Sequence, residues 1–258
     1  MTDSSLADRV HRGMEVAKGI ALLGEKAIVT AFTKPMSLKD LAQQIELIGQ
    51  KSVAIAVLTA IFSSMVMTVQ FASQLSRFGA KEYVGTIVSL SLVRELGPVL
   101  TALMVGGRVG AGIAAELGSM AVTEQIDAIR SMGADPVRKL VVPRVVAAVI
   151  IMPLLTGMSN VLGVLGAMMV AFVTTGVNMT LFITSATTAV DLSDLAGGLM
   201  KTLFFGFFIS VIACYRGIHT HGGTEGVGRA TTETVVLTSV VTLISDFVLT
   251  SILLQFGL

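Results

Sequence analysis

Long apolar runs with few charged residues recur five times along the chain, separated by shorter polar stretches. The first run, residues 52–73, carries no charged residue at all. A helix of about 20 residues suffices to cross the hydrocarbon core of a bilayer, so each run is long enough to span one. We therefore predict an all-α polytopic membrane protein with five transmembrane helices, at about 52–73, 83–107, 145–173, 195–215 and 235–256.

The first fifty residues follow a different pattern. Apolar residues recur at helical spacing from Leu6 to Ile28, with charged residues between them, and again from Leu38 to Ile48 after Pro35. This pattern indicates one or two amphipathic helices, which lead directly into the first span. We predict that residues 1–50 form cytoplasmic interfacial helices and that 51–258 form the five-span domain. A soluble tail helix packed on a partner is the alternative.

Composition supports a membrane location and excludes several other classes. The chain is 53% hydrophobic and 14% charged, whereas about 25% of the residues of soluble domains are charged. A net charge of +1 argues against a nucleic-acid partner, because phosphate binding needs a basic surface. The single cysteine, Cys214, excludes an internal disulfide. His219 and His221 lack a third ligand in their loop, so we predict no metal site.

The distribution of lysine and arginine predicts the orientation. Of the 18 basic residues, seven precede the first span, five lie between the second and third spans, and two lie between the fourth and fifth. The opposite side has only Arg77 and Lys81. Since cytoplasmic loops carry the excess of positive charge, the N-terminus is predicted to be cytoplasmic and the C-terminus to lie on the other side.

The connection between the second and third spans has the pattern of a short amphipathic helix. Thr123 is placed to cap it, Ile126 and Ile129 share one side, and Gly133 ends it. We predict a helix over about 119–133. On the cytoplasmic side, such a helix could be the coupling element that a motor protein binds. An ordinary capped loop helix is the alternative.

A long block of this connection and of the second span resembles the MlaE family of ABC transporter permeases very closely. The block reads VRELGPVLTALMVGGRVGAGIAAELGSMAVTEQIDAIRSMGADPVRKLVVPR, and the later GGTEGVGRATTETVV fits the same family. The resemblance covers roughly residues 45–256. It implies a permease that moves phospholipids between the inner membrane and the periplasm or outer membrane of a bacterium.

The resemblance also implies partners. They are a second copy of the permease, a dimer of cytoplasmic ABC ATPase chains, a STAS-domain protein bound to the ATPase, and a periplasmic hexamer of MCE-domain chains. The C-terminus would then be periplasmic. The lipid would enter an outward-facing cavity at the homodimer interface.

The sequence contains no G-x-x-x-x-G-K-[ST] phosphate loop, and no Gly-Lys pair occurs in it. The glycine-rich runs GGRVGAG and GGTEGVGRA lie in or beside apolar spans, so they fit close helix packing better than nucleotide binding. We therefore expect no cofactor and no enzymatic activity in this chain. ATP and Mg²⁺ would be bound by the partner ATPase.

Charged residues inside the spans are the candidate chemistry. A charge that faces lipid at depth costs about 2.5–3.5 kcal/mol on insertion scales, so Arg94 and Lys201 should face a cavity or a counter-charge. Glu95 is placed to pair with Lys201 or with Arg94 of a second copy. The residues alone leave two readings open, an ion pair that fixes helix register or a substrate site. The resemblance favours the substrate site.

A phospholipid pocket needs cationic or hydrogen-bonding groups for the head and apolar walls for the tails. Pro98 frees a backbone carbonyl one turn before it and is expected to bend the span around such a cavity. Asp246 is expected to make a structural contact with a Ser or Thr hydroxyl rather than to carry a proton. The predicted substrate-binding residues are Arg94, Glu95, Lys201, Gln70, Gln74, Tyr83, Leu75, Phe78, Leu96 and Val99.

The predicted ATPase-coupling residues are Thr123, Glu124, Gln125, Asp127, Ala128 and Arg130, all in the short cytoplasmic helix. Two other functions compete with an ATP-driven permease. An ion-coupled secondary transporter of a hydrophobic substrate would use Glu95, Lys201 and Asp246, and would be expected to show internal repeats, which the sequence lacks. A membrane scaffold would not need charges deep in its spans.

Overall fold

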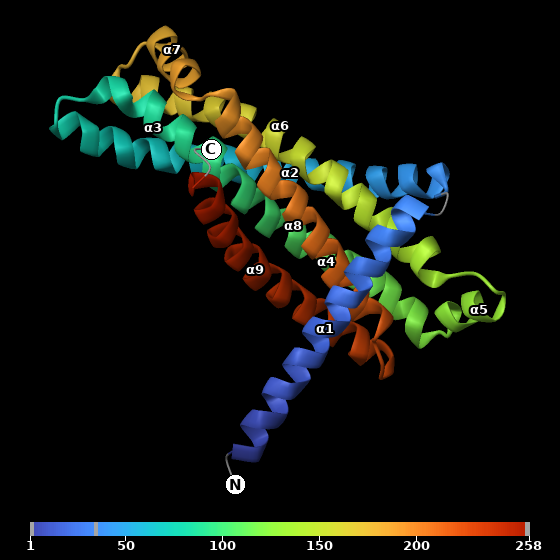
Figure 1. Ribbon diagram of the computed structural model, residues 1–258. Coiled ribbons are helices and arrows are strands. Elements are labelled where there is room, and N and C mark those ends of the chain that lie inside the picture. Colours follow the sequence, from blue (N-terminus) through green and yellow to red (C-terminus); the bar gives the residue numbers. More distant parts are fainter. Residues whose placement is uncertain (1–2, 34–35, 256–258) are drawn as a thin grey trace.

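The computed structural model describes residues 3–33 and 36–255, and this part of the chain is helical throughout, without strands (Figure 1). The described residues leave out 1–2, 34–35 and 256–258. Small parts of the predicted segments 1–50 and 51–258, and the end of the fifth predicted span, therefore lie outside the described residues. The elements are α1 (Asp3–Thr33), α2 (Leu38–Arg77), η1 (Lys81–Tyr83), α3 (Val84–Ser91), η2 (Leu92–Leu96), α4 (Gly97–Val122), α5 (Gln125–Ser131), η3 (Val137–Val141), α6 (Val142–Thr175), α7 (Met179–Ala189), α8 (Leu192–Ile218) and α9 (Gly223–Gln255).

Five continuous helical stretches of the described chain are long and apolar enough to cross a membrane, which confirms the five predicted spans. They cover Leu38–Arg77, Lys81–Val122, Val137–Thr175, Leu192–Ile218 and Gly223–Gln255. Each begins before the predicted run, because the helices continue through the charged residues that flank the apolar core. Arg108, where the second span was expected to stop, lies inside α4, and its Nη1 donates to Ser52 Oγ at 2.9 Å.

The helices approach closely where small residues face a neighbour. Ser64 on α2 donates to the carbonyl of Gly163 on α6 at 2.7 Å. Gly106 and Gly110, predicted as packing positions, lie against Ile209 of α8 and Thr234 of α9. Small side chains at such points let backbones meet, which is how helices associate in lipid. Gly112, in the same glycine-rich run, has no atom of its own chain within 4 Å of an added Cβ, so its role in packing stays a prediction.

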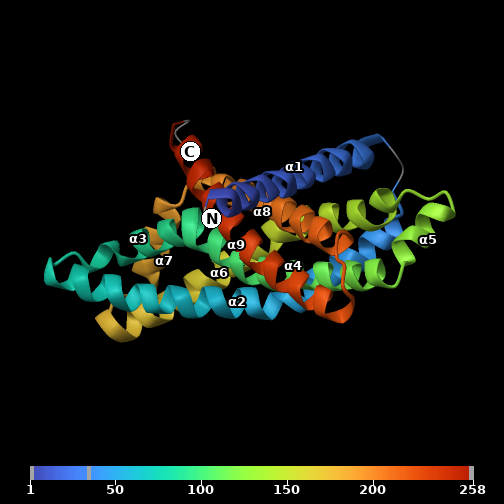
Figure 2. The same ribbon diagram turned by 90° about the horizontal axis from the view of Figure 1, so that it is seen from below.

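The bundle has two distinct ends (Figures 1 and 2). At one end, α7 covers α3 through a buried cluster that includes Val84, Val88 and Phe182. At the other end lies α5. Ile126 and Ile129, predicted to share one side of this helix, are both buried. The helix α4 begins near the first end and runs to α5 at the second.

Helix α1 crosses α8, and Figure 1 shows its N-terminal half projecting away from the bundle. Gly19 lies directly against the ring of Tyr215, and Lys26 Nζ is 3.6 Å from Asp135 Oδ1, between α5 and η3. The second predicted amphipathic segment is not a separate helix, because residues 38–50 are the first turns of α2. The division of the chain at residue 50 therefore coincides with no helix end.

We expect Gly206→Ala to destabilise the bundle. A Cβ on Gly206 would lie 2.7 Å from the carbonyl oxygen of Ala148, so α8 must move away from α6. Overpacking of this kind typically costs about 1–3 kcal/mol of unfolding free energy. Thermal unfolding of the purified protein in detergent measures it. Gly157→Ala, with no atom within 4 Å of the added Cβ, is the control; an equal loss in both variants would contradict the packing.

Candidate functional site

The charged residues of the second and fourth spans form one connected group. Arg94 of η2 contacts Asp194 of α8 through Nε and Nη2, and both nitrogens meet Asp194 Oδ1. Asp194 is buried and is held in turn by the start of α8, because its Oδ2 accepts from the backbone N–H of Asp191 at 2.9 Å. Arg94 therefore pairs within its own chain.

Lys201 of α8 is buried, and its ammonium meets four oxygen acceptors. Glu95 Oε2 lies 2.8 Å from Nζ, which confirms the predicted pairing of these two residues, and Thr250 Oγ1 lies 2.7 Å away. The carbonyl oxygen of Arg94 accepts at 3.1 Å. Asp246 Oδ1 is 3.5 Å from Nζ, so Asp246 makes a charge contact rather than the Ser or Thr contact that we expected.

The carbonyl of Arg94 is available because of Pro98. An α-helical residue at position 98 would donate its N–H four residues back, to Arg94, and proline has no N–H. The helix adjusts here by one π-helical turn, η2, and α4 resumes at Gly97. The predicted freeing of a carbonyl is thus confirmed, and the ammonium of Lys201 takes it.

Gly198 lets α8 come close enough for these contacts. A Cβ at this position would clash with the carbonyl oxygen of Val93, on η2. Only glycine fits at this approach, so the distance between Lys201 and the π-turn is fixed partly by Gly198. The sequence showed a glycine pair at 197–198 but gave no reason for it.

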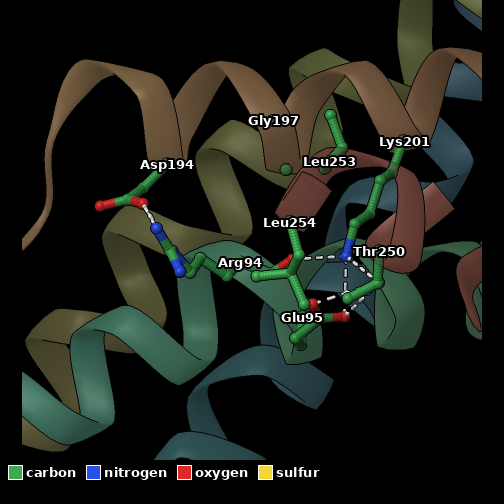
Figure 3. Close-up of a pocket in the computed structure, with 9 residues that line it drawn as sticks. Arg94, Glu95, Asp194, Gly197, Lys201, Thr250, Leu253 and Leu254 are labelled. Atoms are coloured by element: carbon green, nitrogen blue, oxygen red, sulfur yellow. Dashed lines mark hydrogen bonds and ion pairs between the residues drawn. The ribbon is translucent and has the colours of Figure 1, made fainter. Parts of the chain in front are cut away.

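These groups line one small pocket between η2, α8 and α9, shown in Figure 3. The cavity measures about 30 Å³, room for little more than a water or two. Leu253 and Leu254 of α9 complete its wall. In Figure 3 the Arg94–Asp194 pair lies on one side and the Lys201–Glu95–Thr250 group on the other, with Leu254 between them.

The other predicted substrate residues do not line this pocket. Gln70, Gln74, Phe78 and Tyr83 are exposed on α2, on the turn that follows it and on η1. Leu75 packs against the cluster below α7. Leu96 and Val99 are half-buried near the π-turn without being among the lining residues. Their contact with a substrate stays a prediction.

Two polar pocket residues, Asp194 and Thr250, and Asp246, which contacts Lys201, were not among the predicted binding residues. Asp194, Thr250 and Asp246 lie in the fourth and fifth spans, far along the chain from residues 94 and 95. A carboxylate at the start of a span is a common helix cap, so nothing in the sequence marked Asp194 as a partner of Arg94. The rule that an intramembrane cation needs a counter-charge could have suggested it.

The predicted coupling helix is shorter than expected, because α4 extends to Val122 and α5 covers only Gln125–Ser131. Thr123 does not cap it: its hydroxyl donates to the carbonyl of Ser119 at 2.8 Å, which closes α4 instead. Glu124 makes the turn between the helices with a φ of 58°, in the left-handed region.

The remaining coupling candidates lie on α5 and its first turn. Arg130 pairs with Asp127 at 2.8 Å, and Gln125 donates to Thr123 Oγ1 at 3.0 Å. Ala128 is exposed. A cavity of about 390 Å³ separates α5 from the turn between α8 and α9, and Glu124, Asp127 and Arg130 line it.

The five long apolar helices define a multi-pass membrane protein, and sequence comparisons place it more closely. The family described as permease MlaE matches residues 41–252. A "probable ABC transporter permease protein" of Rickettsia typhi is 43% identical over 235 residues, 91% of this chain and 91% of the relative.

Relatives also occur outside Rickettsia. A "probable ABC transporter permease protein" of Synechocystis is 42% identical over 217 residues, 84% of this chain and 82% of the relative. The chloroplastic protein TRIGALACTOSYLDIACYLGLYCEROL 1 of Arabidopsis thaliana is 35% identical over 246 residues, 95% of this chain and 69% of the relative.

The chain therefore belongs to the MlaE family of ABC transporter permeases. As a permease subunit it is not itself an enzyme, and its partner is a separate ATPase subunit.

We expect Lys201→Met to destabilise the protein by about 1–3 kcal/mol, because it leaves Glu95 and Asp246 without their counter-charge inside a span. Both carboxylates keep some exposure, which holds the loss below that of a fully buried pair. Adding Glu95→Gln should recover part of the loss. Thermal unfolding of both variants measures the coupling, and strictly additive losses would show that the pair is not coupled.

Proposed function

We propose that this chain is the permease of an ABC transporter that moves phospholipids between the inner membrane and the periplasm or outer membrane. The observation that carries the proposal is a cluster of paired charges inside the spans, with a guanidinium and a carboxylate at its partly exposed side. A charged side chain that faces lipid inside a span is costly unless a polar group contacts it. A phospholipid headgroup can supply that polar contact to the partly exposed guanidinium and carboxylate. The Arabidopsis relative is named after a diacylglycerol glycolipid, which supports a lipid substrate.

The pocket of one chain is too small for a headgroup and its acyl chains. We infer that the substrate cavity opens toward the periplasm between two copies of the chain. Helix α9, which forms one wall of the pocket, supports this, because little of it is buried within one chain. Val236, Leu243, Ile244 and Phe247 leave an apolar face along it that is available to a second copy.

The ATPase dimer would dock on α5. The loop that follows this helix contacts α1 at the same end of the bundle, through Lys26 and Asp135. That agrees with the cytoplasmic side that the positive charges predict, and with a bacterial inner-membrane location. A STAS-domain protein bound to the ATPase and a periplasmic MCE-domain hexamer would complete the assembly, with no cofactor held by the permease.

Arg94→Gln should lower the amount of phospholipid bound to the purified protein. A lost charge-assisted hydrogen bond to a phosphate corresponds to about a tenfold loss of affinity. Native mass spectrometry of the protein released from membranes measures the bound lipid. Arg94→Lys keeps the charge and should retain more lipid. Arg77→Gln, an exposed arginine outside the pocket, is the control. Unchanged occupancy in Arg94→Gln, or no bound phospholipid in the wild type, would contradict the proposal.

Reversing both acidic charges at α5, with Glu124→Lys and Asp127→Lys, should release the ATPase. Both carboxylates border the cavity beside α5, and a reversed charge at a contact is repelled by the partner's complementary surface. Co-purification of the ATPase with the permease measures the loss. The double variant Glu15→Lys and Glu25→Lys makes the same charge change on exposed positions of α1. Retention of the ATPase in the first variant would place the docking surface elsewhere.

A further inference from the structure

Exposure divides the charged group of the pocket into two sets. The side chains of Arg94 and Glu95 are 42% and 39% exposed, whereas those of Lys201 and Asp194 are 3% and 4% exposed. Asp246 lies between, at 19%. A headgroup that reaches the open side of the pocket therefore meets one guanidinium and one carboxylate, which are neighbours in the sequence.

The buried set holds the exposed set in place. Asp194 engages Nε and Nη2 of Arg94, so the N–H groups of Nη1 point away from that contact. Glu95 is held by Lys201 at 2.8 Å and by the hydroxyl of Thr250, which donates to Oε1 at 3.2 Å. Lys201 is thus placed to position Glu95 rather than to contact a headgroup.

A fixed guanidinium beside a fixed carboxylate is complementary to a zwitterion. Arginine binds phosphate oxygens through charge-assisted hydrogen bonds, and a carboxylate binds an ammonium in the same way. Building on the phospholipid transport proposed above, we propose that the pocket prefers phospholipids whose headgroup combines a phosphodiester with a primary ammonium, such as phosphatidylethanolamine. Arg94 binds the phosphate and Glu95 binds the ammonium.

The same groups disfavour the other common headgroups. The residues that line the pocket include two cations and two carboxylates, and Asp246 adds a further carboxylate at Lys201. A lipid with a net negative headgroup, such as phosphatidylglycerol, therefore meets no excess of positive charge there. A choline has no N–H to donate to Glu95. Cations of that kind are recognised by aromatic faces, and no aromatic side chain is among the described residues that line the pocket.

The test compares the lipids retained by the full-length protein in nanodiscs made of equal parts phosphatidylethanolamine, phosphatidylglycerol and phosphatidylcholine. After transfer to detergent, bound lipid is identified by native mass spectrometry. We expect phosphatidylethanolamine to be enriched over its share of the nanodisc. Glu95→Gln should lower the ratio of phosphatidylethanolamine to phosphatidylglycerol by about three- to tenfold, the loss of one charge-assisted contact at a half-exposed site.

Two further variants serve as controls for Glu95→Gln. Glu82→Gln makes the same change at an exposed residue outside the pocket and should leave the ratio unchanged. Glu95→Asp keeps the carboxylate and should retain part of the preference if Glu95→Gln folds poorly.

The outcomes separate the two proposals. Phospholipid bound in the same proportions as in the nanodisc would overturn the headgroup preference and leave phospholipid transport standing. An enrichment that Glu95→Gln does not change would overturn the role of Glu95. If no phospholipid is bound at all, the preference and the proposed transport fail together.

Discussion

The ammonium of Lys201, buried inside a membrane span, is the group on which the architecture of the pocket depends. An uncompensated charge in that position is costly, so acceptors must converge on it. They come from two other elements: Glu95 and the Arg94 carbonyl from η2, and Thr250 and Asp246 from α9. One cation therefore holds three elements of the bundle at a fixed spacing.

The local backbone makes this convergence possible. Pro98 removes the N–H that would occupy the Arg94 carbonyl, the π-turn absorbs the change, and Gly198 lets α8 approach. Arg94 and Glu95 thereby become the partly exposed face of the group. From this point α4 runs without interruption to α5, so one helix joins the pocket to the proposed ATPase contact. A helix of 26 residues is about 39 Å long, enough to carry a movement across the bilayer.

Hydropathy predicted the five spans because an apolar run of bilayer length has few alternatives to a helix in lipid. It predicted their ends poorly, since Arg108 and residues 38–50 continue their helices. Charge alone offered Lys201 or Arg94 of a second copy as the partner of Glu95, and Lys201 is the partner observed. Asp194 and Thr250 were missed because their partners lie 100 and 155 positions away, and nothing in a single sequence reports which faces of the spans meet. The π-turn likewise follows from packing that the sequence does not display.

The proposed transport depends on a phospholipid headgroup that binds at the partly exposed side of this charged group. The most direct measurement is a cryo-electron microscopy structure of the permease with its ATPase in a lipid nanodisc. We expect headgroup density within hydrogen-bond distance of the Arg94 guanidinium, with Lys201 still buried against Glu95. A lipid bound elsewhere between two copies, with the Arg94–Asp194 and Lys201–Glu95 pairs closed off from it, would contradict the account and leave these charges a structural role alone.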